Sequence, residues 1–493
     1  MKSKKKEITI IIIIAVVVVA LTGIYFATKA IIGNDTSETS SAIERKFIYP
    51  NIQRADVQDI TVTNSYGSYK VYRASDNNFY FEGAEFVGYD SEKFSSLIVN
   101  STYMLSLYKL EGITDYSIYG LDVEKDNPAY VEINTVDNKY HKIFIGDAIP
   151  SGGGYYAKYY NEDTVYVLDS SIATSHLCSV YYYLQPYLSI QISSPTDYVN
   201  INNFMFSKKL NEDDEALTPV VNIRLKAANE KIENDIFPYL MVYPTNVYTA
   251  STDAYSAVQA TLAAMSGTSV VDYGIIPASE ENTEEYAAYI ERLAKWGLDK
   301  PMYEVLYSYD DQYYYIKFSK PDEDGNLYAY SMLSTAVVEL PISNIPFLEW
   351  GLIDFVDVQI FSQNIGTVHK IVASFDDKSY IYNIVLDDEK KVTNVYADGK
   401  EYNVDSFKKY YLTFLQFYLV DYQEPPDEGT EPILTVNVEC DSGNFEYKFY
   451  RSTSRKCFYT INGEGEFYVS YDMVKNMMDQ SIAISKDEIL SNE

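Results

Sequence analysis

The apolar and polar positions of the chain follow different patterns in different regions. Residues 8–27 form an apolar run, rich in Ile and Val, that contains no charged side chain. Beyond residue 50, apolar positions alternate with polar ones over short segments, or recur every three to four residues over longer ones. Alternation is typical of half-buried β-strands, and the longer spacing is typical of amphipathic helices. The patterns predict one membrane-spanning helix followed by a strand-rich body.

The apolar run is long enough to cross a bilayer, because a helix of 20 residues extends about 30 Å. It is preceded by four lysines, Lys2, Lys4, Lys5 and Lys6. Positive charges favour the cytoplasmic side, so we expect the N-terminus inside the cell and the body outside. The alternative is a cleaved signal peptide, but its apolar core has only about 7–15 residues. We therefore expect a cytoplasmic tip and uncleaved anchor in contact with membrane lipid at residues 1–33, and a polar stalk at 34–50.

Three segments of the body resemble one another closely. They align without a gap over twenty residues, from Pro128, Pro301 and Pro432. The tenth residue of each segment is an aspartate, namely Asp137, Asp310 and Asp441. Apolar alternation on both sides of a turn-forming aspartate predicts a β-hairpin, since the carboxylate can accept bonds from nearby backbone amides. Two further strands are expected after each hairpin, at 155–159 and 165–168, at 327–330 and 337–340, and at 457–460 and 467–470.

The residues ahead of the hairpins also repeat in part. Two copies share an entry signature, Tyr119-Gly120-Leu121-Asp122 and Trp296-Gly297-Leu298-Asp299, which residues 425–429 replace in the third copy. An amphipathic helix is expected earlier in each copy, with its N-cap at Asp90, Asp253 or Asp405. Strands are expected before these helices, at 60–63, 69–72 and 79–81 in the first copy and at 358–360, 370–372 and 380–382 in the third. The middle copy also carries an acidic insertion at 211–215.

These elements predict the fold class α+β. We expect the transmembrane helix to be followed by three tandem repeats of antiparallel β-meanders, each flanked by an amphipathic helix. The repeat modules are expected at 51–189, 190–350 and 351–493.

The paired motifs YGLD…P…IGD…GGGYY…VYVLD and FYRSTSRKCFYTINGEGEFYVSYDMV resemble a bacterial domain-of-unknown-function family, numbered four-three-four-zero. Its members are usually single-pass membrane proteins and are often encoded beside ABC transporters of the gliding-motility type. The resemblance covers most of the chain beyond residue 50 and implies an extracytoplasmic accessory of a transporter. It brings no catalytic residues, so none is carried over to this chain.

Composition narrows the classes of partner. The formal net charge of the chain is −32 and its sequence pI is near 4.4. An acidic body repels phosphates, so a general nucleic-acid binder is excluded. Hydrophobic residues make up 47% of the chain, which is enough for sizeable cores and excludes disorder as the overall state.

Several residues invite a chemical interpretation, but none predicts a catalytic, cofactor or metal site. The glycine loop at 151–154 is followed by a strand and lacks a phosphate-binding lysine, so a hairpin loop is expected. The acidic loop at Asp322 has Leu333 where a calcium-binding loop needs glutamate. His176 and Cys178 lack a second pair of zinc ligands, and His141 is expected to pack as an aromatic residue. The third histidine of the chain, His369, suggests no such role.

Cysteine and tyrosine usage completes the sequence picture. Cys440 and Cys457 are expected at opposite ends of a meander, too far apart for a disulfide, so we predict free thiols. The chain contains 51 tyrosines, which are expected mainly in sheet packing and secondarily as an adhesive surface. We predict a non-catalytic binding or scaffold accessory of an ABC transporter or another envelope complex. A cell-wall glycan-binding protein and an envelope hydrolase are the alternatives.

Overall fold

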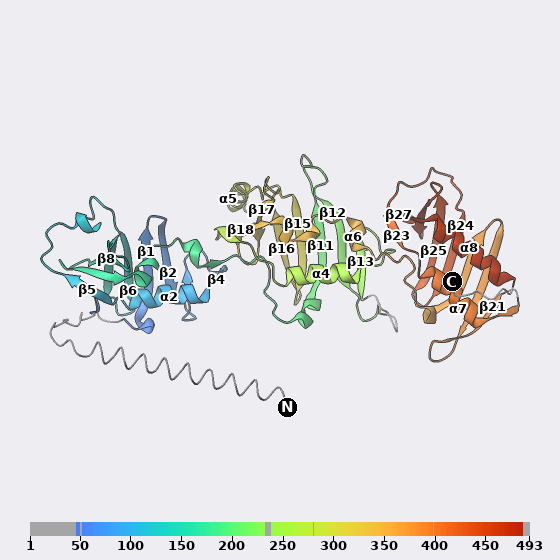
Figure 1. Cartoon of the computed structure of the whole chain (residues 1–493), viewed down its shortest axis with the longest axis horizontal. Helices are drawn as coiled ribbons and strands as arrows, with labels where there is room; N and C mark the ends of the chain where they lie inside the picture. Colours follow the sequence, from blue (N-terminus) through green and yellow to red (C-terminus); the bar gives the residue numbers. More distant parts are fainter. Residues whose placement is uncertain (1–45, 50–51, 232–237, 280, 398, 487–493) are drawn as a thin grey trace, which may run out of the picture. The chain divides into compact units, whose positions relative to one another are not determined.

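The structure is a computed structural model that describes residues 46–49, 52–231, 238–279, 281–397 and 399–486 (Figure 1). Described residues up to Phe79, together with Glu92–Ser179, form one compact unit, and Tyr80–Ser91 together with the residues from Val180 onward form another. Within the described ranges no helix is long and apolar enough to cross a membrane. The predicted anchor at 8–27 and most of the predicted stalk lie outside these ranges.

The strands of the described residues form three large sheets and one small one. The first sheet contains β1 (Val57–Asn64), β2 (Gly67–Arg73), β3 (Phe79–Phe81), β5 (Ser106–Leu110), β6 (Ala129–Thr135), β7 (Tyr140–Ala148), β8 (Gly154–Tyr159) and β9 (Val165–Asp169). The second contains β11 (Ile201–Lys208), β12 (Thr218–Leu225), β13 (Tyr239–Tyr243), β14 (Ser269–Asp272), β15 (Tyr303–Tyr309), β16 (Gln312–Phe318), β17 (Asn326–Ser331) and β18 (Ala336–Pro341). The third contains β19 (Val368–Phe375), β20 (Lys378–Leu386), β21 (Val392–Ala397), β22 (Lys400–Tyr402), β23 (Leu419–Tyr422), β24 (Leu434–Cys440), β25 (Gly443–Arg451), β26 (Lys456–Ile461) and β27 (Glu464–Ser470). The small sheet pairs β4 (Gly88–Tyr89) with β10 (Leu184–Gln185).

The three large sheets have the same strand order. In the first sheet the order is β3-β2-β1-β6-β7-β8-β9-β5, and the second follows it strand for strand as β13-β12-β11-β15-β16-β17-β18-β14. The third sheet repeats this order with β22 added beside β21. Each sheet thus joins a hairpin-connected group of strands to a four-stranded meander, and the strand that follows the helix pairs at the far edge of the meander. Such a repeated, non-sequential order indicates that one folding unit occurs three times.

The predicted class α+β is wrong, because the described residues form mainly antiparallel β-sheets with few helices. The sequence separated a strand-and-helix unit from a hairpin unit in each copy, whereas in the structure both belong to one sheet. The first strand of each copy pairs directly with the first meander strand, as β1 does with β6 and β11 with β15. Alternation within a strand shows which residues share a face, but it does not show which strand lies beside it.

The hairpin prediction is confirmed in all three sheets. Asp310 and Asp311, with φ of 47° and 61°, form the two-residue turn between β15 and β16, and Asp441 begins the turn between β24 and β25. The turn at Asp137 is longer, since Asn134 pairs with Tyr140. The gapless alignment is therefore wrong by one residue in the first strand of the first copy, where Val131 is buried at the position of Val305.

Two other boundary predictions need correction. The side chains of Ser251 and Asn403 cap α4 (Thr252–Leu262) and α7 (Val404–Phe414), so Asp253 and Asp405 lie in the first turn and not at the N-cap. Asp90 directly precedes α2 (Ser91–Thr102). In the third copy, residues 358–360 form no strand of the sheet, and the segments at 370–372 and 380–382 belong to its first two strands, β19 and β20. Both errors arise because Ser, Asn and Asp all cap helices and because short apolar runs occur in loops as well as in strands.

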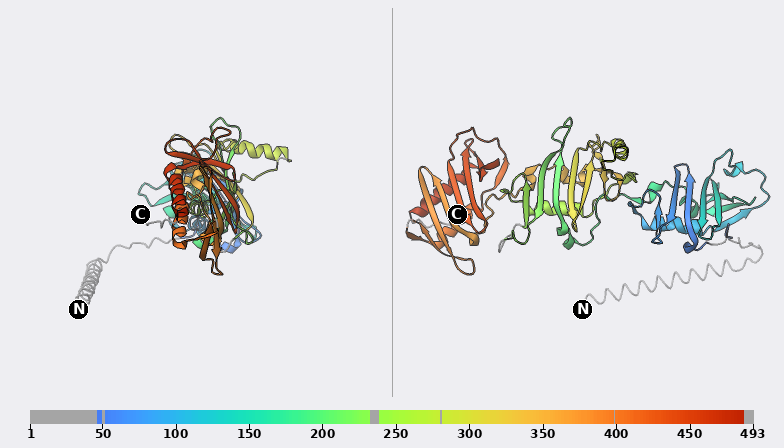
Figure 2. Two further views of the ribbon diagram at one scale, coloured as in Figure 1. Left: turned by 90° about the vertical axis from the view of Figure 1, so that its right-hand side faces the viewer. Right: turned by 180° about the vertical axis from the view of Figure 1, so that it is seen from behind.

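The cores lie between the sheets and these helices. In Figure 1, α4 crosses one face of the second sheet, and the right-hand view of Figure 2 shows the same sheet from the other side. The Tyr255 hydroxyl and the Gln259 side-chain amide of α4 both donate to the backbone oxygen of Ile201, and the Tyr255 ring contacts Phe204 of β11. Sequence reasoning missed α5 (Thr283–Ala294) and α8 (Tyr471–Ser485), although both have apolar residues at helical spacing. The short helices α6 (Leu352–Phe355) and α3 (Ser170–Thr174) are also present, and α3 follows β9.

Candidate functional site

Each large sheet carries an open hollow beside the segment that leads into its meander. The first hollow has a volume of about 650 Å³, the middle hollow about 370 Å³ and the third hollow about 280 Å³. The first and middle hollows are bounded by the same four parts of the fold. These are the end of the first strand, the turn at Gly120 or Gly297 (the glycine turn), the start of the meander, and the end of the second meander strand. In the third hollow, Tyr450 and Phe458 stand at positions that also line the middle hollow. Residues 425–430, which replace the glycine turn, line its other side. The position of the hollow is therefore a property of the repeated fold.

The glycine turn shapes the first two hollows. In the middle sheet Gly297, with φ of 68°, donates to the backbone oxygen of Ala294, and Leu298 donates to that of Leu293. The first sheet has the same two bonds, from Gly120 to Ser117 and from Leu121 to Tyr116. This is the Schellman pattern that ends helices, in which a left-handed residue suits glycine. Both leucines are buried, so the turn is anchored to the core while its backbone borders the hollow.

The charge of the hollow differs between the first two sheets. Val131 pairs with Val62, and Val305 pairs with Phe206, so the two valines occupy equivalent positions. From these pairs we count residue by residue to the ends of the first and second strands of the hairpins and just beyond them. By this count, three lysines that line the middle hollow correspond to residues that line the first: Lys209 to Ser65, Lys300 to Asp126 and Lys320 to Asp147. The same frame thus presents cations in one sheet and anions in the other.

The middle hollow combines these lysines with aromatic rings. Trp296 and Tyr328 line it, with ring centroids 4.8 Å apart at an interplanar angle of 60°. Lys320 forms an ion pair of 2.6 Å with Glu212, and both side chains are well exposed. Among the described residues, Lys209 and Lys300 form no ion pair. Two ammonium groups are therefore available to a ligand without breaking an internal contact.

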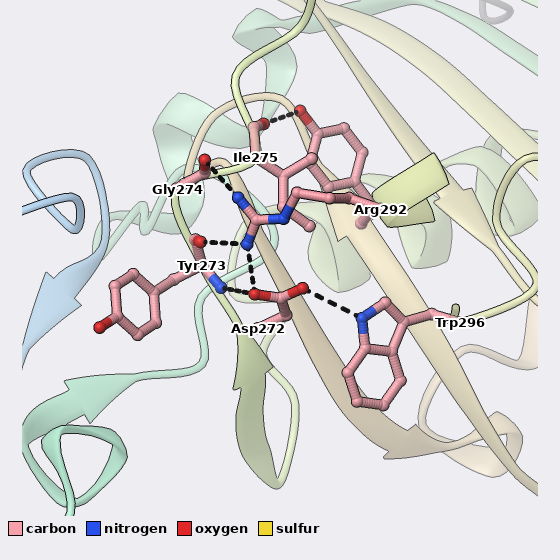
Figure 3. A network of polar contacts seen from close by, with 7 residues as sticks. Asp272, Tyr273, Gly274, Ile275, Arg292 and Trp296 are labelled. Carbon is pink, nitrogen blue, oxygen red and sulfur yellow. Dashed lines mark hydrogen bonds and ion pairs between the residues drawn. The ribbon is translucent and has the colours of Figure 1, made fainter. Parts of the chain in front are cut away.

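A network of hydrogen bonds holds the indole of Trp296 through its ring nitrogen (Figure 3). The Trp296 Nε1–H donates to Asp272 Oδ2 over 3.3 Å, and the other oxygen of this carboxylate accepts from the Arg292 guanidinium. Arg292 also donates to the backbone oxygens of Tyr273 at 2.8 Å and Gly274 at 2.9 Å. The network ties the end of β14 to α5 and to the glycine turn. It leaves Trp296 held in one orientation at the wall of the hollow.

Helix α5 carries the framework of this site and occurs only in the middle sheet among the described residues. Its Tyr289 and Leu293 pack into a core cluster with Leu298 of the glycine turn and Tyr330 of β17. Tyr289 and Tyr315 are joined through their hydroxyls at 3.0 Å. Both rings also line a further hollow of about 380 Å³. The helical spacing of Tyr286, Tyr289, Leu293 and Trp296 was the sequence signal that could have revealed this element.

The loops that suggested phosphate or calcium are structural turns. The glycine loop at 151–154 connects β7 to β8, with Gly152 and Gly153 at φ of 76° and 81°, so the expected hairpin loop is confirmed. In the Asp322 loop, the carboxylate accepts from the backbone amides of Asp324 and Asn326. Throughout the described ranges, no three His, Cys, Asp or Glu side chains gather as a metal site.

The histidines have structural partners. His141 Nδ1 lies 2.9 Å from the Tyr159 hydroxyl, and its ring packs on Tyr49, as expected for an aromatic role. His176 is fully buried, with Nε2 at 2.9 Å from Ser101 Oγ, and burial lowers its pKa to about 4. His369 Nε2 lies 2.6 Å from Asp441, and bonds from His369 lower the pKa of this aspartate. The three side chains are not brought together at any hollow.

Two of the cysteines and many of the tyrosines are core residues. Cys440 ends β24 and Cys457 lies in β26, with β25 between them, and both are free and buried. Burial raises the pKa of Cys457 to about 11, which keeps this thiol protonated and unreactive. Eight of the largest fully buried side chains are tyrosines: Tyr183, Tyr255, Tyr307, Tyr330, Tyr382, Tyr410, Tyr447 and Tyr459. Sheet packing therefore accounts for many of the tyrosines, while others, such as Tyr66 and Tyr313, are exposed.

The sequence named Trp296 only as part of a repeated motif, and it gave no reason to single out the lysines of the middle hollow. They come from three segments between residues 209 and 320, and only the pairing of β11 with β15, and of β15 with β16, brings them together. In comparisons with known proteins, no family model matched the chain, and neither a curated protein nor a solved structure matched it. The geometry of the hollows is therefore the basis of the functional inference.

Proposed function

We propose that this chain is a non-catalytic binding and scaffold protein of the cell envelope, tethered by residues 1–33 with its three sheets outside the membrane. The observation that carries the proposal is the recurrent hollow, whose frame is retained while its charge changes from Asp126 and Asp147 to Lys300 and Lys320. A retained frame with altered lining residues suits the recognition of different ligands or partner segments. A catalytic centre would instead need a converged acid, base and nucleophile.

The tether gives such a scaffold its effect. Holding three binding sheets near a membrane complex raises the effective concentration of each for its partner, without any new contact. The resemblance of the glycine-turn and hairpin motifs to the domain-of-unknown-function family supports an ABC transporter or another envelope complex as that partner. The acidic body favours solubility outside the membrane and opposes approach to anionic lipid.

One arrangement bears on the hydrolase alternative. Ser101 and His176 form a serine–histidine pair at 2.9 Å, but both side chains are completely buried. The Nδ1 of His176 lies 2.8 Å from the backbone oxygen of Ile172, so this contact belongs to local packing. A substrate cannot reach such a pair, which favours a structural role over a nucleophilic one.

Co-purification from membranes tests the proposal. Full-length protein with a C-terminal tag is expected to retain membrane transporter subunits, and a variant lacking residues 1–33 is expected to lose them. In the matched control, an unrelated transmembrane helix replaces residues 8–27 and should restore the retention, because a tether alone is required. Retention of no membrane subunit by the full-length chain, or a tag that is protected from protease in intact cells, would contradict the proposal.

A further inference from the structure

The middle hollow differs from its counterpart in the first sheet by features that point to a ligand. Three lysines line it against a single glutamate, in a chain whose formal net charge is −32. Local positive charge on an acidic protein concentrates anions at that place. The volume of about 370 Å³ lies within the range of roughly 300–1,000 Å³ that is usual for small-molecule sites.

The aromatic side of the hollow adds a second requirement. Trp296 presents a large, rigid ring beside Tyr328, and the bond to Asp272 holds its orientation before any ligand arrives. Preorganised aromatic surface binds the apolar face of a ring with little loss of conformational entropy. A small inorganic anion would leave this surface unused, and an uncharged sugar would leave the lysines unused.

We propose that the middle hollow binds an anionic saccharide, in which a sugar ring stacks on Trp296 and a phosphate or carboxylate group is bound by Lys209, Lys300 and Lys320. This inference rests on the proposed binding function and names its ligand class. Lysine binds phosphate and carboxylate as a point charge, so either anion satisfies the site. Glu212 competes with the ligand for Lys320, to which it is paired at 2.6 Å.

The first hollow provides a contrast within the same chain. Ser65, Asp126 and Asp147 occupy the positions of the three lysines. A ligand anion would be repelled there by two carboxylates, although the glycine turn has the same backbone geometry. Binding of an anionic saccharide is therefore expected in the middle hollow and not in the first.

Trp296 itself can report the binding. The chain has two tryptophans, so full-length protein with the substitution Trp350→Phe has Trp296 as its sole indole. Glucose 6-phosphate and glucuronate serve as the phosphate-bearing and carboxylate-bearing probes, and glucose and inorganic phosphate serve as their separate halves. We expect a saturable change in emission with at least one anionic sugar, at lower concentration than with either half, and weaker binding at high salt.

Matched substitutions locate the binding. Lys300→Gln should weaken it about tenfold, the equivalent of one charge-assisted contact, whereas Lys295→Gln, at an exposed position outside the hollow, should change it less than about twofold. Glu212→Gln should strengthen it. Urea unfolding followed by Trp296 emission verifies that each variant is folded.

Three results would overturn the inference: no saturable change with either anionic sugar, equal effects of the two lysine substitutions, or binding of glucose or inorganic phosphate as tight as that of the anionic sugars. Any of these results with membrane co-purification intact would reject only the saccharide site. Loss of co-purification in the full-length protein, with saccharide binding retained, would instead reject the transporter scaffold.

Discussion

Removal of the Arg292 guanidinium should destabilise the middle sheet and release the indole of Trp296. The substitution Arg292→Met keeps an unbranched apolar stem, so the packing of α5 changes little while three donated hydrogen bonds are lost. Two of these bonds go to the backbone oxygens of Tyr273 and Gly274, and the third goes to Asp272. The Asp272 carboxylate then keeps only the bond from Trp296 and the bond from the backbone amide of Tyr273 among those drawn in Figure 3.

The magnitude follows from the exposure of the pair. The side chains of Arg292 and Asp272 are 36% and 18% exposed, so water screens part of the interaction. Hydrogen bonds to charged groups contribute about 1.5–3 kcal/mol each when buried, and exposed ion pairs contribute about 0–1 kcal/mol. For this partly exposed set we expect a total loss of about 2 kcal/mol, which is a shift of about 1 M in the urea midpoint at an ordinary m-value.

The assay uses full-length protein with Trp350→Phe, in which urea unfolding is followed by the emission of Trp296. Arg292→Met should lower the midpoint and make the indole more accessible to a soluble quencher. The control is Arg224→Met in β12 of the same sheet, which also removes three donated bonds, two to Glu230 and one to the backbone oxygen of Leu225. It should lower the midpoint to a similar extent but leave the quenching of Trp296 unchanged. Unchanged quenching in Arg292→Met, or an equal increase in quenching for the two substitutions, would refute the role assigned to the network.

Three further predictions concern the frame of the sheets. Burial of His176 lowers its pKa to about 4, below the value of about 6.5 expected in the unfolded chain, so the stability that it supports is complete above pH 6.5 and should fall by about 3 kcal/mol as the pH drops to 4. Hydrogen-exchange protection factors at segments 97–102 and 172–178, corrected for the slower intrinsic exchange at low pH, should fall over this window. Unchanged protection factors, or a histidine NMR signal for His176 that titrates near pH 6.5, would contradict the burial argument. In Gly146→Ala the new Cβ would lie 2.3 Å from the backbone oxygen of Tyr119, and overpacking of this kind should cost about 1–3 kcal/mol of stability. The control Gly152→Ala, where nothing lies within 4 Å of the new Cβ, should cost about 1 kcal/mol or less for its positive φ. Equal hydrogen-exchange rates in segment 117–121 of the two variants would argue against the close approach. Leu298→Ala leaves a cavity beneath the glycine turn, because Leu298 is fully buried, and should lower the stability measured by Trp296 emission by about 2–5 kcal/mol; a loss below 1 kcal/mol would show that the turn is not anchored to the core.

The sequence alone was sufficient to predict the hairpins, as the turns at Asp310 and Asp441 demonstrate. Alternating apolar residues determine a strand and its buried face, and a turn-forming aspartate between two strands determines how they reverse direction. The repeated residues around Gly120 and Gly297 were also visible in the sequence, but the left-handed turn that they form at a helix end became evident only in the structure. Even here the register of the first copy was misjudged by one residue, because the length of the turn at Asp137 depends on which residues pair across it.

The order of strands and the site were decided by the tertiary structure alone. Strand β14 is separated from its partner β18 by a helix and three strands, and no local pattern in 269–272 specifies that pairing. The middle hollow likewise depends on the tertiary structure, since Lys209, Trp296 and Lys320 lie far apart along the chain. Local periodicity reflects the backbone geometry of a few neighbouring residues, whereas strand pairing and side-chain convergence reflect the burial of surfaces contributed by distant segments. The sequence therefore determined the elements and their faces, and the packing of those faces against one another determined where charge and aromatic rings meet.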